Sequence, residues 1–276
     1  MIVTADDFGL AVEVNDAVEL AHRDGILTAA SLMVGAPAAA DAVARARRMP
    51  TLRVGLHLVL VEGRPVLPSG EVPDLVDCRG MFREDMARMG LEIFLRPSAR
   101  RQIAAEIEAQ FAAFAATGLV LDHVNAHKHY HLHPTIARSV VEIGRSYRLR
   151  SVRVPEEPSA LLRRIDPATP SSTSLWPYTA LLRRRLRRAA LATSDRVFGL
   201  AWSGAITPSR MAMLLSHLPD GVSELYTHLA TSDCFAGAAP GYRYADELAA
   251  LTAPATRDAL QASHARLVAF SDLPVP

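Results

Sequence analysis

Carboxylate and imidazole side chains gather in three short segments of the sequence. Asp6 and Asp7 follow a β-prone run at Ile2–Thr4, and His57 lies in an apolar run at Leu52–Leu60. The third segment holds five of the ten histidines of the chain, at positions 123, 127, 129, 131 and 133. One carboxylate combined with imidazoles is a ligand set that suits first-row divalent metal ions. The three segments together therefore indicate a metal site.

Each segment also has a simpler structural interpretation. An Asp-Asp pair is usually a turn or a helix cap, and a lone histidine in a strand is usually a hydrogen-bonded core residue. A histidine-rich run can also be a nonspecific metal-binding tract. In an extended segment, however, the alternate positions from His127 to His133 would place four imidazoles on one face. That face is crowded for a purely structural role, so we favour a functional site.

Strand-like and helix-like runs alternate along the chain. We expect strands at Ile2–Thr4, Ile26–Val34, Leu52–Leu60, Leu119–Val124, Ser151–Val154 and Gly221–His228. We expect helices at Val12–Arg23, Ala38–Arg48, Ala99–Ala116, Thr135–Tyr147, Pro177–Leu191 and Pro254–Phe270. This order predicts a mostly parallel sheet with helical crossovers, in an α/β fold that is similar to a barrel. Active sites of such folds form at the carboxyl ends of the strands, where the candidate ligands lie.

The composition is that of an ordinary globular protein. The chain has 276 residues, of which 50% are hydrophobic and 21% are charged, and this length fits one domain over 1–276 with an insertion at about 155–195. A formal net charge of +1 argues against a protein built to bind nucleic acid.

Two cysteines are too few for a disulfide framework and favour a reducing compartment. No apolar run approaches the ~18 residues of a membrane span, and no signal-peptide pattern begins the chain, so we expect a cytoplasmic protein.

Three motifs resemble the signatures of the YdjC-like (ChbG/HpnK) carbohydrate deacetylases, in the same order and spacing. They are Thr4–Gly9, Gly55–Leu58 and His123–Pro134, and weaker matches occur at Glu62–Pro65, at Arg243 and at Glu247–Leu248. The resemblance extends from Ile2 to about Phe270. It implies a distorted TIM-barrel-like fold of parallel strands surrounded by helices. It also implies that a divalent metal ion is used to remove acetyl groups from N-acetylated sugars.

The same resemblance implies roles for individual residues. It assigns the metal ligands to Asp7, His57 and His127, and the general base to Asp6. Two nitrogens and one oxygen suit zinc, and magnesium is an alternative.

A general acid must also protonate the leaving amine, and imidazole titrates near neutral pH. His228 is our candidate for this role. His129 and His131 are alternatives, or they orient ligands from outside the coordination sphere. We expect Arg64 and Arg243 to contact the substrate or to support the site.

A narrower resemblance suggests a lipid-linked substrate. Phe198–Ala205 and Glu224–His228 resemble the hopanoid-biosynthesis branch of the family, often called HpnK. That branch implies deacetylation of an N-acetylglucosamine head group on a hopanoid lipid. The chain departs from the family at His228-Leu229-Ala230, where the usual motif is His-Pro-Gly, although His228 itself is kept.

Three other functions compete with this interpretation. They are deacetylation of soluble chito-oligosaccharides, metal-dependent phosphoester hydrolysis, and metal or sugar binding without catalysis. Asp6 beside a ligand-type Asp7 argues against simple binding, because a binding site needs no general base.

The expected helix Pro177–Leu191 is strongly basic. Leu182 and Leu186 share its apolar face, and five arginines at 183, 184, 185, 187 and 188 occupy much of the remainder. One interpretation is the solvated face of a surface helix. The other is peripheral contact with an anionic membrane surface, such as the inner membrane, with Trp176 and Tyr178 as interfacial anchors.

Overall fold

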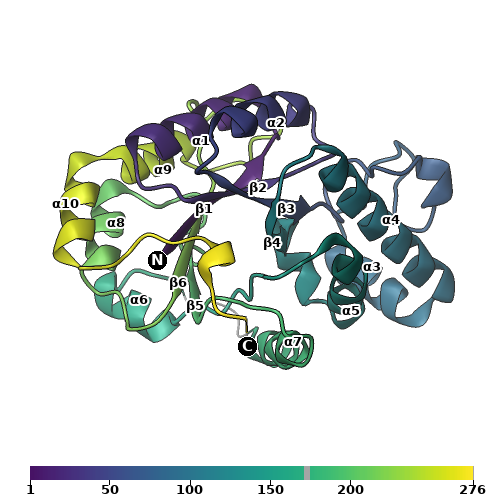
Figure 1. The fold of residues 1–276 in the computed structure, drawn as a ribbon. Helices are drawn as coiled ribbons and strands as arrows, with labels where there is room; N and C mark the ends of the chain where they lie inside the picture. The colour runs from purple at the N-terminus through teal and green to yellow at the C-terminus, as the bar shows by residue number, and fades with distance from the viewer. Residues whose placement is uncertain (171–174, 276) are drawn as a thin grey trace.

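A single parallel sheet of six strands organises the computed structural model, which describes residues 1–170 and 175–275 (Figure 1). The strands are β1 (Ile2–Phe8), β2 (Ala29–Leu32), β3 (Arg53–Leu58), β4 (Leu121–Ala126), β5 (Arg196–Phe198) and β6 (Ser223–Thr227). Their order in the sheet is β4-β3-β2-β1-β6-β5, and every neighbouring pair is parallel. The sheet curls into a half-barrel, which confirms the expected barrel-like α/β fold.

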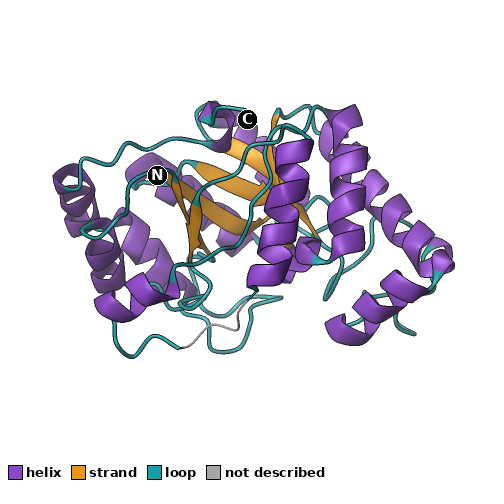
Figure 2. Ribbon diagram, turned by 90° about the horizontal axis from the view of Figure 1, so that it is seen from below, coloured by secondary structure: helices purple, strands orange, loops and turns teal. Residues whose placement is uncertain are grey.

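Helices surround this sheet, as Figure 2 shows. The α-helices are α1 (Val12–Asp24), α2 (Ala39–Arg48), α3 (Met86–Leu95), α4 (Pro97–Ala116), α5 (Pro134–Gly144), α6 (Ser159–Ile165), α7 (Trp176–Arg188), α8 (Pro208–Leu215), α9 (Tyr244–Thr252) and α10 (Pro254–Ala262). The short 3₁₀ helices are η1 (Ser69–Glu71), η2 (His127–Leu132), η3 (Arg145–Tyr147) and η4 (Phe270–Asp272). Proline occupies the first turn of five of these helices, where its missing N–H costs no helical hydrogen bond.

The sheet is covered on both faces, and its strands are accordingly apolar. All seven residues of β1 are buried, including two aspartates. A second, smaller cluster closes the end of the sheet where β1 and β2 begin, and it includes Ile2, Ala29, Phe270 and Leu273. The C-terminal η4 thus packs at the amino ends of the strands, opposite the end where the candidate ligands lie.

Several expected elements are shorter in the structure, and two of them show a clear local cause. Ser151–Val154 forms only isolated bridges, from Val152 to β4 and from Ser151 to residue 192, and Pro155 after it has no N–H to extend the pairing. The C-terminal helix ends at Ala262, well before Phe270, because His264 has left-handed backbone (φ 56°) that a helix cannot accommodate.

The stretch 155–195, which we expect to be an insertion, contains α6 and α7. Residues 171–174 of this stretch lie outside the described part of the chain. Leu162 of α6 and Leu182 and Leu186 of α7 are buried in the same core as the sheet. Across residues 1–170 and 175–275, none of the helices has both the length and the apolar character needed to cross a bilayer.

Candidate active site

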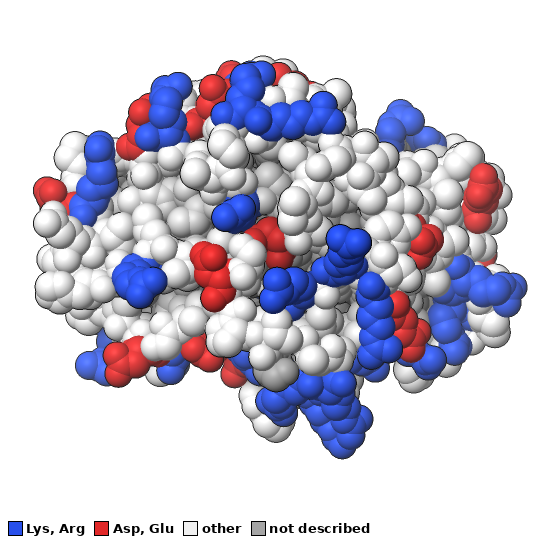
Figure 3. Space-filling view, in the orientation of Figure 1, with Lys and Arg blue, Asp and Glu red and all other residues white. Residues whose placement is uncertain are grey.

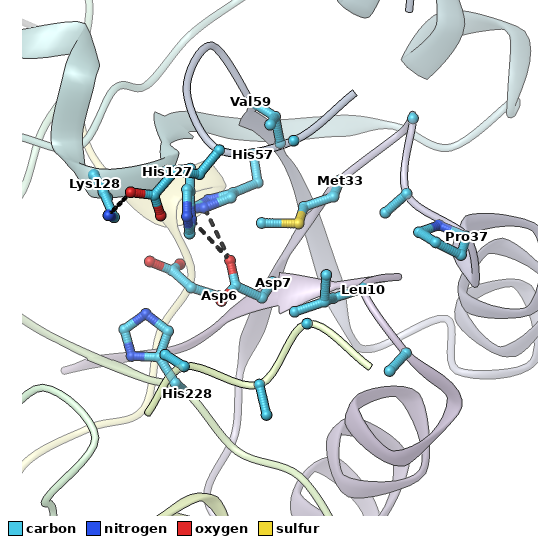
Figure 4. A pocket seen from close by; sticks show the side chains of 18 of the residues that line it. Asp6, Asp7, Leu10, Met33, Pro37, His57, Val59, His127, Lys128 and His228 are labelled. Carbon is cyan, nitrogen blue, oxygen red and sulfur yellow. Dashed lines mark hydrogen bonds and ion pairs between the residues drawn. The ribbon is translucent and has the colours of Figure 1, made fainter. Parts of the chain in front are cut away.

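The carboxyl ends of the strands open into one large cavity of about 1910 Å³. Its lining includes Asp6 and Asp7 from β1, His57 from β3, His127 directly after β4, and His228 directly after β6. These five candidate residues therefore meet at one place, at the end of the sheet where parallel α/β folds carry their active sites. Figure 4 shows their side chains around the cavity.

An irregularity in β1 lets two consecutive aspartates reach this cavity. Successive side chains of a regular strand point to opposite faces. The register of β1 against β2 shifts between Ala5 and Phe8, and Asp7 has a left-handed φ of 61°. Such a conformation is unfavourable for a residue other than glycine and is concentrated at functional sites. It turns Asp7 so that both Asp6 and Asp7 line the cavity (Figure 4).

Asp7, His57 and His127 converge as a ligand set. Asp7 Oδ1 lies 3.3 Å from His57 Nε2 and 3.4 Å from His127 Nδ1, and the three ligand atoms are all within 4.8 Å of one another. Two atoms that each lie about 2.1 Å from one ion in tetrahedral geometry are about 3.4 Å apart. The observed spacing therefore matches that of atoms around a common metal ion.

The hydrogen-bond pattern of these three residues also fits a metal ion. Asp7 Oδ1 and His57 Nε2 are buried, and neither has a hydrogen-bond partner among the described residues. Buried polar atoms are almost always satisfied, and an ion bound between Asp7 and His57 would satisfy both of these atoms. Burial raises the pKa of Asp7, but the neighbouring imidazoles of His127 and His57 lower it well below its usual value. Asp7 is therefore a carboxylate, as a metal ligand must be.

Asn125 of β4 supports this geometry. His57 Nδ1–H donates to Asn125 Oδ1 at 2.7 Å, which leaves the lone pair of Nε2 directed at Asp7. Asn125 Nδ2 in turn donates to Asp6 Oδ1 at 3.0 Å. One amide thus joins a candidate ligand to the candidate base. We did not single out Asn125 in the sequence, although it lies inside the third motif.

Asp6 is held by a buried arginine. Arg153 Nη1 lies 2.5 Å from Asp6 Oδ2, and Arg153 Nη2 lies 3.0 Å from Asp6 Oδ1. Burial alone would raise the pKa of Asp6, but the charge of Arg153 lowers it far below the usual range. Asp6 is therefore ionised. Among the described residues Oδ1 accepts two hydrogen bonds and Oδ2 accepts one, so the spare acceptor capacity is on Oδ2.

Arg153 also contacts a second buried carboxylate. Its Nε and Nη2 donate to Glu224 Oε1 of β6 at 2.8 and 2.6 Å, and its guanidinium lies 4.6 Å from the centre of the Tyr226 ring. Arg153 is completely buried, which is tolerable for a charge only with such partners. Sequence reasoning missed Arg153. The available signal was a single charge inside the apolar run Ser151–Val154.

His228 lies on the side of Asp6 and Asp7 that is opposite to His57 and His127 (Figure 4). Its backbone N–H donates to Glu247 Oε2 at 2.6 Å, and burial raises the pKa of Glu247 to about 8. Burial lowers the pKa of His228 itself, so the imidazole is mostly neutral at neutral pH. Glu247 thus holds the backbone that carries His228, which gives the weak match at Glu247–Leu248 a structural role.

The histidine run is not extended. His127–Leu132 forms η2, with left-handed φ values of 52° at Lys128 and 54° at His129. Four histidines therefore do not share one face. His129 Nε2 lies 3.2 Å from the Tyr226 hydroxyl at the cavity, whereas His131 is fully buried, and its Nε2–H donates to the backbone oxygen of Arg153 at 2.9 Å.

The two expected substrate-contacting arginines lie in different places. Arg64 is exposed and lines the cavity. Arg243 is exposed and pairs with Asp246 in the first turn of α9, and it is not part of the cavity lining. Lys128 and Glu62 form an ion pair across the rim of the cavity (Figure 4).

Comparison with known proteins identifies the family of this chain. The sequence pattern of the family described as "YdjC-like protein" matches residues 1–262. A protein from Brevibacillus brevis named carbohydrate deacetylase is 31% identical to this chain, and the alignment covers 99% of both chains. A protein of the same name from Geobacillus stearothermophilus is 32% identical to this chain, and that alignment covers 92% of this chain and 89% of the relative.

A crystal structure from Enterococcus faecalis V583, of a protein for which cellobiose-phosphate cleavage has been suggested, shares the fold. The two chains superpose with a TM-score of 0.76 and 24% identity over 98% of this chain and 96% of the other. The match over residues 1–262, together with relatives aligned along almost the whole length, means that this chain belongs to the YdjC-like family.

Proposed function

We propose that this protein is a metal-dependent carbohydrate deacetylase, which hydrolyses the acetamide group of an N-acetylated amino sugar. The observation that carries the proposal is the arrangement of Asp7, His57 and His127 around one point, with the ionised Asp6 beside it. The names of the relatives from Brevibacillus brevis and Geobacillus stearothermophilus support the same reaction.

The proposed site separates the tasks of amide hydrolysis among its residues. Asp7, His57 and His127 would hold one divalent ion, zinc or magnesium, which supplies Lewis acidity at the acetyl carbonyl. Asp6 Oδ2 accepts a proton from the attacking water, and Arg153 keeps this carboxylate ionised and fixed. His228 lies on the opposite side of the two aspartates. Because its imidazole is mostly neutral, it must first take up a proton, such as the one that Asp6 removes from the water, and it then gives that proton to the leaving amine. His129 is the alternative donor at the cavity.

We further propose that the amino sugar is carried by a lipid, such as an N-acetylglucosaminyl hopanoid. The resemblance at Phe198–Ala205 supports this, and the surface of α7 is compatible with it. Arg184, Arg187 and Arg188 are exposed, and basic side chains gather over α7 at the lower edge of the molecule in Figure 3. Trp176 is 67% exposed at the start of the same helix. Peripheral contact with the inner membrane would bring the cavity to such a substrate.

Not every arginine of α7 is available for a membrane surface. Arg183 bonds Glu156 and the backbone oxygens of Ser194 and Asp195, and Arg185 donates to the backbone oxygen of Pro134. These two arginines therefore attach α7 to the remainder of the protein, and only the other three can contribute to a docking surface.

Product analysis tests the proposed reaction. We expect acetate to be released from N-acetylated amino sugars, to stop when a chelator removes the metal ion, and to resume when zinc or magnesium is restored. Release of phosphate from a sugar phosphate, without acetate release, would replace the deacetylase with a phosphoesterase. A parallel assay on a lipid-linked N-acetylglucosamine and on soluble chito-oligosaccharides separates the two substrate classes.

A further inference from the structure

A chain of buried polar side chains runs beneath the candidate metal site. Asn125 Nδ2 lies 2.9 Å from Ser31 Oγ of β2, Ser31 Oγ lies 2.9 Å from His123 Nε2, and His123 Nδ1 lies 2.9 Å from Asp122 Oδ2. The second Asp122 oxygen accepts the backbone N–H of Ser271 at 2.9 Å. The chain therefore connects η4, at the amino ends of the strands, to the cavity at the opposite ends.

Asp122 lies at one end of this chain of side chains, and Asp6, which accepts from Asn125, lies at the other. These two carboxylates set the direction of every hydrogen bond between them. Asp122 can only accept, so His123 carries a proton on Nδ1, and a neutral imidazole in this position presents a bare Nε2. Ser31 must then donate to His123, and its oxygen accepts from Asn125. Asp6 also only accepts, so the Asn125 amide turns its NH₂ group toward Asp6 and Ser31.

This orientation leaves the Asn125 carbonyl oxygen facing His57. His57 must then place its proton on Nδ1 and direct the lone pair of Nε2 toward Asp7. That is the tautomer that can bind a metal ion.

Packing locks the imidazole in the middle of the chain. The Phe270 ring of η4 stacks on His123, with ring centres 4.4 Å apart. On the other side, a Cβ atom at Gly55 would lie 2.5 Å from the His123 ring, so only glycine fits there. This one contact explains why Gly55 begins the second motif and why His123 begins the third. Neither residue lines the cavity.

We propose that Asn125 is a positioning residue that fixes His57 and Asp6 together, and that Ser31, His123 and Asp122 fix Asn125. The inference rests on the proposed function only in taking His57 as a metal ligand. It assigns the buried polar residues of β2 and β4 to the assembly of the metal site, although Ser31, His123 and Asp122 do not line the cavity.

The test measures metal binding directly on the metal-free full-length protein. Loss of a group that orients a ligand typically lowers metal affinity 10–100-fold. We expect Asn125→Ala to lower zinc affinity by that factor in a competition titration with a chromophoric chelator. We expect Ser31→Ala to lower it several-fold and to alter the absorption spectrum of the cobalt-substituted protein.

Ser223→Ala is the matched control for Ser31→Ala. Ser223 is also a buried serine in a strand of the same sheet, but its hydroxyl has no hydrogen-bond partner among the described residues. We expect Ser223→Ala to keep the zinc affinity and the cobalt spectrum of the unmodified protein. Because each serine variant removes a single oxygen atom, both should fold even if Asn125→Ala does not.

Ser31→Ala behaving like Ser223→Ala in both measurements would overturn the proposal and leave the chain as ordinary core hydrogen bonding. The readouts do not depend on turnover, so failure of the proposed function is separate. A protein that binds zinc in a Ser31-dependent manner but releases no acetate would reject the deacetylase and retain the positioning role.

Discussion

Arginine occupies two contrasting regions of this molecule. Arg153 is completely buried between Asp6 and Glu224, next to the cavity, and most of its donors are used. Arg184, Arg187 and Arg188 are exposed on α7, at the edge of the molecule (Figure 3). A buried charge requires partners that fix its geometry, whereas an exposed charge does not. The structure therefore specifies what Arg153 does, and only binding experiments can show what the arginines of α7 do.

Removing the buried charge should have the largest effect. Arg153→Met leaves Asp6 and Glu224 as uncompensated buried carboxylates, and breaking such a pair costs about 3–5 kcal/mol of unfolding free energy. We expect denaturant unfolding to show this loss, together with loss of acetate release. The same substitution at Arg187 should change the unfolding free energy by less than about 0.5 kcal/mol. Similar losses at the two positions would invalidate the contrast between the two regions.

The two carboxylates that hold Arg153 should differ in their effect on turnover. Asp6→Asn should lower kcat by about 10²–10⁴-fold, the usual contribution of a general base, while metal content stays the same. Glu224→Gln removes the same charge from the other side of Arg153, but Glu224 does not line the cavity. It should destabilise the protein while lowering kcat far less. Loss of metal from Asp6→Asn would instead make Asp6 a ligand.

Replacing His228, on the opposite side of the two aspartates, should lower kcat less than replacing Asp6. His228→Gln should lower kcat by about 10²-fold, at the low end for a general acid, without changing metal content. His129→Gln is the control, because His129 also lines the cavity but is directed to the Tyr226 hydroxyl. A larger loss from His129→Gln than from His228→Gln would transfer the proton-donor role to His129.

The sequence indicates the place of the site well because parallel strands align their carboxyl ends at one edge. Asp7 and His127 come after apolar runs and His57 lies inside one, and the structure brings the three together. The local conformations were less predictable. A regular strand would separate Asp6 from Asp7, and an extended run would align His127 with His129; left-handed backbone at Asp7 and at His129 changes both outcomes.

The partners of Arg153 could not be found from sequence, because they depend on strand order. Asp6 and Glu224 are neighbours only because β6 returns to pair with β1, where Thr4 aligns with Tyr226. Residues 4–6 and 224–226 are more than 200 positions apart, and no local pattern encodes their pairing. The same holds for the contact between His123 and Phe270, which requires η4 to pack beneath the sheet.

The smallest expected effect concerns membrane binding by the exposed arginines of α7, and it depends on the salt concentration. Each basic residue near an anionic membrane contributes about 1 kcal/mol, so replacing Arg184, Arg187 and Arg188 by Gln together should cost at most about 3 kcal/mol of membrane binding. In flotation with anionic vesicles at low salt, affinity should fall by up to about 100-fold, and the difference should shrink as salt is raised. Activity on a lipid-linked substrate should fall in parallel.

Activity on a short soluble N-acetylglucosamine analogue should survive in the triple variant, because the cavity is unchanged. Arg183→Gln provides the opposite control, since Arg183 joins α7 to Glu156 and to the backbone of Ser194 and Asp195. It should lower stability and affect both substrates alike. If the triple variant also loses both activities equally, α7 serves the fold rather than the membrane. If it loses neither vesicle binding nor activity, its arginines are an ordinary solvated surface, and the lipid-linked substrate loses the support it takes from α7.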